Sequence, residues 1–422
     1  MKNFPDIQPP VVIPERVNAP LADVERLPNG IELHVLNCSQ NDVMRVSFVF
    51  RAGTSWQSVP FCASTTVNML SEGTKSWTSH EISEQLDFYG SYFDVNIDRD
   101  YAVVTFCCLT KFFERTMEIA REVIFEPTFP QQELDIYTMK RKQQLILNRT
   151  KPDFVAREVF GNTLFGMEHP YGISSAVECY DALTREDVVR FYDAIYRAEN
   201  CFMVASGKIS DEHRKVLLSV ASQFKSAGSV ATRFFPTPKT EYEKFVPFEG
   251  AVQTSIRIGK MMFPRQHPDF IGLQVVSSVL GGYFGSRLIQ NLRERHGYTY
   301  GVYSAMVNFD KAGYFAIATE VGQQFRNDAV REIYTEVERL CNEKVPQQEL
   351  DIVKNIIVGE MMRVLDGPFG MADVTMENVQ NGFDNSYIDY TVGRIRSMTS
   401  DDVLDMAQKY LGRDGFVTVL VG

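Results

Sequence analysis

Long apolar runs are missing from this chain of 422 residues, since no stretch approaches the length of about 18 apolar residues that a membrane-spanning helix needs. The opening segment, with prolines at positions 5, 9, 10 and 14, also lacks the apolar core of a signal peptide. We therefore expect no membrane partner and a cytoplasmic protein, or a periplasmic one if a signal peptide has been trimmed.

Positive charge is also in short supply. Lys and Arg total 43 against 54 Asp and Glu, which gives a net charge of −11. A nucleic-acid partner would require a basic stripe, so this class of function is excluded. The acidic balance is explained by solubility, and it is equally compatible with a cleft for basic or neutral peptides.

Cysteine pairs with metal-binding spacing are absent. None of the seven cysteines forms a Cys-x-x-Cys motif, so a cysteine zinc site is excluded. Their odd number, and apolar neighbours such as those in Phe106-Cys107-Cys108-Leu109, favour buried free thiols in a reducing compartment.

Catalytic motifs are equally scarce. The six histidines are scattered, and His80 is followed by Glu84 where a zincin helix has its second histidine, which favours a solvated helix turn over a metal site. No Gly-x-Ser-x-Gly elbow or Cys/His dyad supports nucleophilic catalysis. Gly281–Leu288 is rich in glycine but lacks phosphate-loop spacing, so we interpret it as a junction between helices that requires small residues.

An internal duplication is present instead. Three collinear matches support it: Pro130–Ile136 with Pro346–Ile352 (346 − 130 = 216), Leu183–Val189 with Met398–Leu404 (398 − 183 = 215), and Phe202–Gly207 with Phe416–Gly422. This period is far too long for a solenoid, whose repeats span about 20–50 residues. The chain is therefore predicted to contain two homologous domains, each long enough to bury its own core.

The predicted boundaries place the first domain at 1–225 and the second at 241–422. The linker between them, 226–240, is rich in Gly and Ser and then carries Pro236 and Pro238. In each half, strand patterns come in mixed runs and helices are grouped after them. This order predicts an α+β fold in which each domain packs helices on a mostly antiparallel sheet.

Local periodicity predicts the individual elements. In the first half we expect strands at 31–36, 46–50, 92–97, 101–109 and 201–206, and helices at 60–70, 79–88, 113–123, 131–149, 152–164 and 185–196. In the second half we expect strands around 254–258 and at 300–308, 314–321 and 416–421, and helices at 268–280, 326–341, 347–364 and 401–410. Thr184 and Asp187 have the spacing of a capping box, with Asp in place of the usual Glu.

The densest polar signal is Leu292–Tyr300, where an Arg-rich helix end stops at Gly297 and aromatic residues lead into a strand. Arg293 and Tyr300 would converge where the helix meets the sheet. A guanidinium and a phenol together can donate hydrogen bonds to a peptide carbonyl or an oxyanion. The alternative is a capped helix that carries surface charges.

With the duplication, these residues make the whole chain resemble the pitrilysin/insulinase family of zinc peptidases, in the short branch that includes mitochondrial processing peptidase. The resemblance is carried by Leu27–Ile31, Arg51–Thr54, Glu72–Thr74, Gly281–Leu288 and Leu292–Tyr300. It implies two domains arranged as a clamshell around a chamber that admits short or unfolded peptides. It also implies that the strand at 92–97 is the edge that pairs with substrate in the family, although without zinc a structural edge is favoured.

The family's zinc motif, His-x-x-Glu-His, falls on Ser64, Val67 and Asn68. Its third ligand, a glutamate, would fall near Lys142–Leu145, yet no Asp or Glu occurs between Asp135 and Asp153. The resemblance thus implies that this chain has no metal ligands, no general base and no cofactor of its own.

The family's second-domain pair is intact, because Arg293 and Tyr300 are separated by the family spacing (300 − 293 = 7). The resemblance implies a heterodimer in which a homologous subunit carries the zinc and this chain binds the peptide carbonyl. This chain would then contribute to catalysis only with that partner. The alternative is a structural or interaction protein, similar to the core subunits of respiratory complexes. A third interpretation, an independent enzyme with another metal or nucleophile, has no residue cluster behind it.

Overall fold

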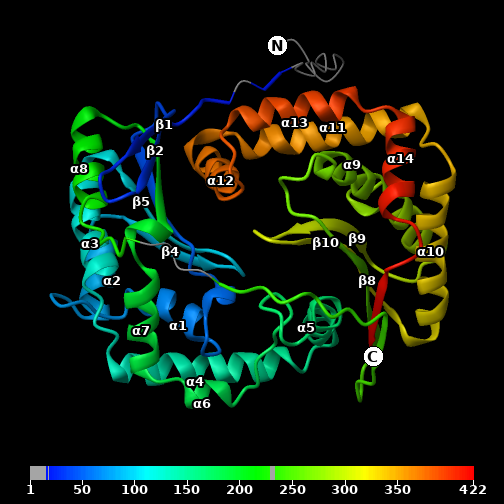
Figure 1. The fold of residues 1–422 in the computed structure, drawn as a ribbon, viewed down its shortest axis with the longest axis horizontal. Helices are drawn as coiled ribbons and strands as arrows, with labels where there is room; N and C mark the ends of the chain where they lie inside the picture. The colour runs from blue at the N-terminus through cyan, green and yellow to red at the C-terminus, as the bar shows by residue number, and fades with distance from the viewer. Residues whose placement is uncertain (1–15, 18, 229–232) are drawn as a thin grey trace, which may run out of the picture.

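The computed structural model describes residues 16–17, 19–228 and 233–422. The proline-containing opening segment and positions 229–232 of the predicted linker lie outside these residues. Figure 1 shows two α+β halves side by side, with a sheet in each and long helices joining them along two opposite sides. None of the described helices combines the length and the apolar character needed to cross a bilayer.

The first sheet has six strands in the order β1-β2-β6-β3-β5-β4. Its strands are β1 (Asp23–Arg26), β2 (Glu32–Asn37), β3 (Val43–Phe50), β4 (Tyr92–Ile97), β5 (Ala102–Leu109) and β6 (Cys201–Gly207). β2 and β6 run parallel, and the other neighbouring strands run antiparallel.

The second sheet repeats this topology with five strands in the order β7-β11-β8-β10-β9. They are β7 (Glu243–Val246), β8 (Gln253–Met262), β9 (Val302–Asn308), β10 (Gly313–Gly322) and β11 (Val417–Val421). β7 and β11 run parallel and the other neighbours antiparallel, so β7 takes the place of β2, and β9 that of β4. The predicted fold class, an α+β fold of two domains with mostly antiparallel sheets, is confirmed.

The helices follow the predicted order with a few additions. The first half contains α1 (Cys62–Met69), α2 (Ser79–Phe88), α3 (Phe113–Phe125), α4 (Gln131–Asn148), α5 (Pro152–Phe165), α6 (Cys179–Ala182), α7 (Arg185–Ile195) and α8 (Asp211–Ala221). The second contains α9 (Phe270–Gly281), the π-helical segment η5 (Ile289–Arg295), α10 (Arg326–Asn342), α11 (Gln347–Val364), α12 (Gly367–Gln380), α13 (Ser386–Ser397) and α14 (Ser400–Tyr410). Single 3₁₀ turns lie at 54–56, 110–112, 198–200 and 323–325.

The capping box before α7 is confirmed. The Thr184 hydroxyl accepts a hydrogen bond from the backbone N–H of Asp187 at 3.2 Å, and the Asp187 carboxylate accepts one from the backbone N–H of Thr184 at 3.1 Å. Thr399 and Asp402 repeat the same box before α14. The shorter Asp side chain therefore replaces Glu in this role at equivalent places of the two halves.

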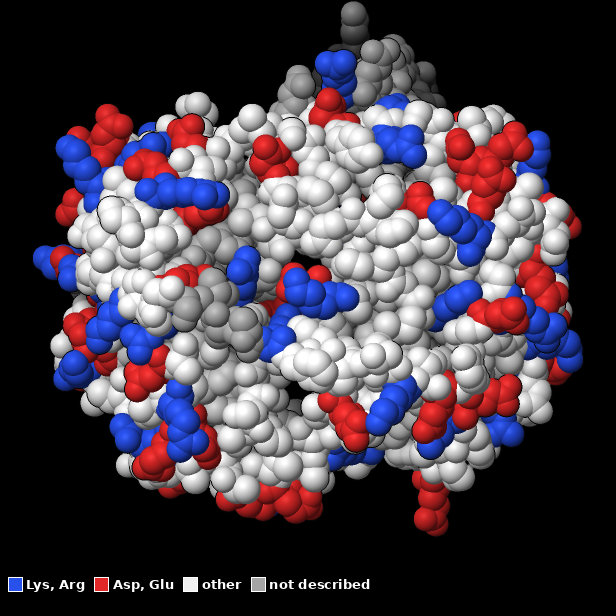
Figure 2. Space-filling view, in the orientation of Figure 1, with Lys and Arg blue, Asp and Glu red and all other residues white. Residues whose placement is uncertain are grey.

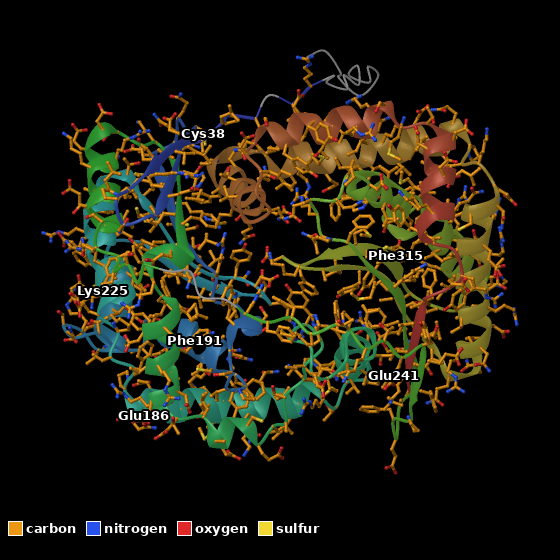
Figure 3. The ribbon with its side chains drawn as sticks, viewed as in Figure 1. Cys38, Glu186, Phe191, Lys225, Glu241 and Phe315 are labelled. Atoms are coloured by element: carbon orange, nitrogen blue, oxygen red, sulfur yellow. The ribbon has the colours of Figure 1, made fainter. Side chains whose placement is uncertain are left out.

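Each half has its own core between its sheet and its outer helices. Phe191 of α7 is buried in the first core and Phe315 of β10 in the second, as Figure 3 shows by their positions. The thiols are less uniform than predicted: Cys62, Cys108 and Cys201 are buried, whereas Cys38, Cys107, Cys179 and Cys341 are half-buried.

The two halves exchange helices. α5 from the first half covers the second sheet, where Ala156 and Phe160 pack with Val417 and Val419 of β11. α12 from the second half covers the first sheet in the same way (Figure 1). Because α5 and α12 follow the duplicated helices α4 and α11, this exchange is reciprocal.

An ion pair ties each exchanged helix to the sheet it covers. Arg45 on β3 lies 2.7 Å from Asp373 on α12, and Arg257 on β8 lies 2.6 Å from Asp153 on α5. Both arginine side chains are largely buried. These contacts hold the halves together with defined geometry.

Candidate functional site

Arg293 and Tyr300 meet in the structure, at the end of η5 and just before β9. The Arg293 guanidinium carbon lies 5.0 Å from the centre of the Tyr300 ring. Gly297 brings them together, because its positive φ of 63° reverses the chain and the Tyr298 N–H bonds back to the Leu292 carbonyl at 2.8 Å. The predicted convergence of the two side chains is therefore present.

A third residue, Phe284, completes this group. The Arg293 guanidinium carbon lies 4.9 Å from its ring centre, so the cation is held between two aromatic rings. Phe284 belongs to Gly281–Leu288, which joins α9 to η5 as predicted. A Cβ on Gly281 would lie 2.7 Å from the Ser304 backbone nitrogen, so the junction does require a small residue there. Phe284 was not predicted to belong to this group. The one feature that marks it in the sequence is an aromatic side chain among glycines.

The group is open to solvent. Tyr300 is 87% exposed and Phe284 66% exposed, although both are large and apolar. Tyr298, two residues before Tyr300, instead stacks on Phe325 at 4.8 Å. Arg293 contacts Glu294 at 3.3 Å, and the Tyr300 hydroxyl makes no hydrogen bond to any described residue. An exposed phenol beside an ordered guanidinium can donate to a carbonyl oxygen that approaches from outside.

The positions that correspond to the zinc motif lie on α1 and bond within the helix. The Ser64 hydroxyl donates to the Phe61 carbonyl at 3.0 Å, and the Asn68 amide donates to the Ser64 carbonyl at 2.8 Å. Val67, at the place of the general base, is fully buried in the core. These three side chains offer neither a strong metal ligand nor a base for water.

The side chain from α4 that faces Asn68 is Arg141, one residue before the predicted Lys142–Leu145. Its guanidinium donates to the Asn68 amide oxygen at 3.1 Å and lies 5.2 Å from the Tyr137 ring centre. The difference arises because Tyr137 and Arg141, four residues apart, share the helix face toward α1, whereas Lys142 turns to Asp181. Burial raises the pKa of Tyr137, so its phenol stays neutral beside this cation.

A guanidinium at this place would repel a divalent cation. No cluster of three or more His, Cys, Asp or Glu side chains suited to a metal ion occurs in the described part of the chain. His80, which resembled half a zincin motif, is an exposed residue of α2 that pairs with Glu84 at 3.3 Å. The interpretation of His80 as part of a solvated helix turn is thus confirmed.

The two groups are held on different halves of the molecule. Ser64, Val67 and Asn68 lie in the first half, and Arg293 with Tyr300 lies in the second; no hydrogen bond or ion pair among the described residues joins them. β4 is the edge strand of the first sheet, as expected, and β9 is the edge of the second. Figure 2 shows openings near the centre of one face, between the halves, with basic side chains beside them.

Comparison with known families finds a match in each half of the chain. Residues 62–169 match the family described as Insulinase (Peptidase family M16), and residues 182–357 match the one described as Peptidase M16 inactive domain. An uncharacterized zinc protease from Streptomyces coelicolor is 21% identical over 368 residues, which cover 84% of this chain and 79% of the relative. The non-peptidase homolog YmxG of Helicobacter pylori is 24% identical over 304 residues, 69% of this chain and 68% of the relative.

Solved structures share the fold over nearly the whole chain. A peptidase M16 inactive domain from Pseudomonas fluorescens superimposes with a TM-score of 0.87 at 21% identity, over 95% of this chain and 97% of the other. A protease from Helicobacter pylori gives a TM-score of 0.89 at 15% identity, over 96% and 100%. With family matches over residues 62–169 and 182–357, the chain belongs to the insulinase (M16) family of peptidases.

Proposed function

We propose that this chain is the substrate-binding subunit of a heterodimeric zinc metallopeptidase that acts on short or unfolded peptides. A homologous chain with an intact His-x-x-Glu-His motif supplies the zinc and the general base. This chain supplies Arg293 and Tyr300, which bind the carbonyl of the bond to be cut. The observation that carries the proposal is the Arg293 guanidinium held between Phe284 and Tyr300 beside a solvent-exposed phenol.

The packing around Arg293 explains why the pair suits this role. A free arginine side chain loses considerable rotamer entropy on binding, whereas a guanidinium already stacked on two rings loses less. Donors fixed before the reaction stabilise the oxyanion that forms in the transition state more effectively than mobile ones. Removal of one such donor lowers the rate by about 100- to 1000-fold.

The α1 site supports the division of labour. Arg141 bonds to Asn68 where a metal ligand would be needed, so this chain does not supply its own zinc centre. A retained carbonyl-binding pair in such a chain has a use only when zinc comes from elsewhere. The similarity to the peptidase M16 inactive domain from Pseudomonas fluorescens and to the non-peptidase homolog YmxG supports this assignment.

The test is peptide hydrolysis by this chain mixed with a homologous chain that carries the zinc motif. Tyr300→Phe removes the phenol donor and keeps the ring under Arg293, so we expect turnover to fall about 100-fold. Tyr303→Phe is the matched control, because Tyr303 is also exposed, at 53%, on β9 but does not contact Arg293. Unchanged turnover in Tyr300→Phe would overturn the proposal and favour a structural role.

A further inference from the structure

A cavity of about 450 Å³ lies in the second half, enclosed by α9, α11, α12 and α13 and by the end of β9. Its volume falls within the range of about 300–1,000 Å³ that is typical of small-ligand sites. It is separate from the group formed by Phe284, Arg293 and Tyr300, none of which lines it.

Apolar side chains form most of its wall. They include Tyr283, Met306, Ile356, Ile357, Met361 and Leu365. All six are half-buried, because they pack on the core or on neighbouring helices on one side and border the cavity on the other. A wall of this kind favours an apolar side chain over water.

One buried polar atom in the wall lacks a partner. Asn378 is 1% exposed, and its amide nitrogen donates to the Asn385 amide oxygen at 3.1 Å. The Asn385 amide nitrogen is itself committed to the Pro20 carbonyl and the Thr375 hydroxyl, so the orientation of Asn378 is fixed. Its oxygen is therefore an acceptor that no described residue satisfies.

A donor lies in the same wall. Arg265 forms an ion pair with Glu377 and places its guanidinium carbon 5.4 Å from the Tyr387 ring centre, but its buried Nε–H has no acceptor among the described residues. Both atoms, however, are shut off from the open space of the cavity. A bound group therefore meets the apolar side chains of the wall and not this donor or this acceptor, which favours an apolar occupant.

The duplicated fold relates this cavity to the degenerate metal site. In the first half, a cavity of about 300 Å³ lies against α1, α4 and α5, and Ser64 and Leu145 border it. α9, α11 and α12 are the counterparts of these three helices. The family's reaction site and the apolar cavity therefore occupy equivalent places in the two halves.

We propose that the apolar cavity binds one aliphatic or aromatic side chain of the peptide substrate. This inference rests on the proposed function and adds a side-chain preference to it. The anchoring residue then sets which peptides are held before their carbonyl reaches Arg293 and Tyr300.

The test is equilibrium binding of fluorescein-labelled peptides to the full chain without its partner, measured by anisotropy. The peptides are Ala/Gly-based twelve-mers that differ only by a Leu or a Gln, scanned through each position. We expect one Leu position to bind about tenfold more tightly than its Gln counterpart, as burial of one leucine side chain provides. Met361→Trp fills the cavity and removes the difference.

Met362→Trp is the matched control, because this neighbouring residue is exposed and does not border the cavity. Ile357→Ala is a second variant that removes apolar wall from the cavity, and it reduces the difference between the Leu and Gln peptides. Equal binding of the Leu and Gln peptides, or an unchanged difference in both cavity variants, would overturn the cavity assignment while peptide binding stands. Absence of binding by every peptide would overturn the proposed function and this inference with it.

Discussion

Arg233 binds Asp100 across 133 residues of sequence, with a guanidinium nitrogen 2.6 Å from a carboxylate oxygen. Both side chains are almost fully buried, at 10% and 6% exposure. Asp100 also accepts hydrogen bonds from the Tyr171 hydroxyl at 2.8 Å and from the Asp310 backbone N–H at 2.7 Å. One carboxylate in the first half therefore holds the linker and the second half in place.

This geometry predicts a large effect for Asp100→Ala. The substitution leaves the Arg233 guanidinium with the more distant Asp310 carboxylate, at 3.5 Å, and leaves the Asp310 backbone N–H without its acceptor. We therefore expect a loss near the lower end of the roughly 3–5 kcal/mol that a broken buried pair costs. The measurement is the free energy of unfolding from urea titration. Glu168→Ala is the control, because its pair with Lys239 is exposed at 76% and 75% and its loss should change stability little. Similar losses in both variants would contradict the role of Asp100.

The sequence predicted a linker at 226–240 from its glycine, serine and proline content, but not the anchoring of Arg233 within it. Composition reports local conformational freedom, and a partner 133 residues away leaves no local signal. The exchange of α5 and α12 between the two halves was not predicted, for a similar reason. Periodicity showed that 152–164 is a helix, yet it does not show which sheet the helix will cover.

Two helices of the second half, α12 and α13, were missed. α12 contains Gly367, Pro368 and Gly370 near its start, which weaken the helical pattern even though proline is well tolerated in a first turn. Its stability comes from packing Met371 and Met376 onto the first sheet. Tertiary contacts of this kind override local propensity.

For the candidate site, the spacing of Arg293 and Tyr300 left two interpretations open, convergence of the pair and a capped helix that carries surface charges, and the resemblance to the family favoured the first. Phe284 was not predicted, since nothing in the sequence says that the chain folds back over Arg293. Arg141 was missed by one residue, because counting along the chain does not fix which face of α4 is turned toward α1.

The Arg141 contact predicts how a zinc site could be rebuilt. Ser64→His with Asn68→His restores two imidazoles one helical turn apart, but the adjacent guanidinium opposes a divalent cation. We expect tight zinc binding only when Arg141→Glu is added, which supplies a third ligand from α4. Arg141→Gln in the same background separates the removal of charge from the gain of a ligand. Zinc content after dialysis is the measurement, and stoichiometric zinc in the two-histidine variant with Arg141 retained would contradict the expectation.

His169 predicts a loss of stability in mild acid. It is 4% exposed, its Nδ1 accepts the Tyr171 N–H at 3.1 Å, and burial lowers its pKa below the ordinary value of 6.5. The unfolded chain therefore takes up a proton as the pH falls below 6.5, whereas the folded chain stays neutral, so stability present above this pH is lost.

The measurement is urea unfolding at about pH 7.5 and about pH 5.5 for the chain and for His169→Asn, whose side chain does not titrate. We expect a smaller loss in the variant. Burial also lowers the pKa of His34, but its contribution is common to both chains and cancels in the difference. An equal loss in the two chains would show that the pKa of His169 is the same in the folded and the unfolded chain.

Gly259 on β8 tests the exchange of α5. A Cβ at this position would lie 2.6 Å from the end of the Phe160 ring and 2.3 Å from the Phe315 carbonyl oxygen. Phe160 comes from α5 and the Phe315 carbonyl belongs to the sheet itself, so the Phe160 ring must shift and the packing of α5 on β8 is loosened. We expect Gly259→Ala to lower the free energy of unfolding by about 1–3 kcal/mol, as overpacking of a core does.

Gly393→Ala is its control. Gly393 lies in α13 with nothing within 4 Å of the added carbon, so the change should stabilise the chain by about 0.5–1 kcal/mol through helix propensity. Hydrogen exchange of α5 amides locates the effect. In Gly259→Ala we expect faster exchange confined to α5 and β8, because α5 has no other sheet to cover. Unchanged protection of the α5 amides would mean that packing on the second half is not what keeps this helix folded.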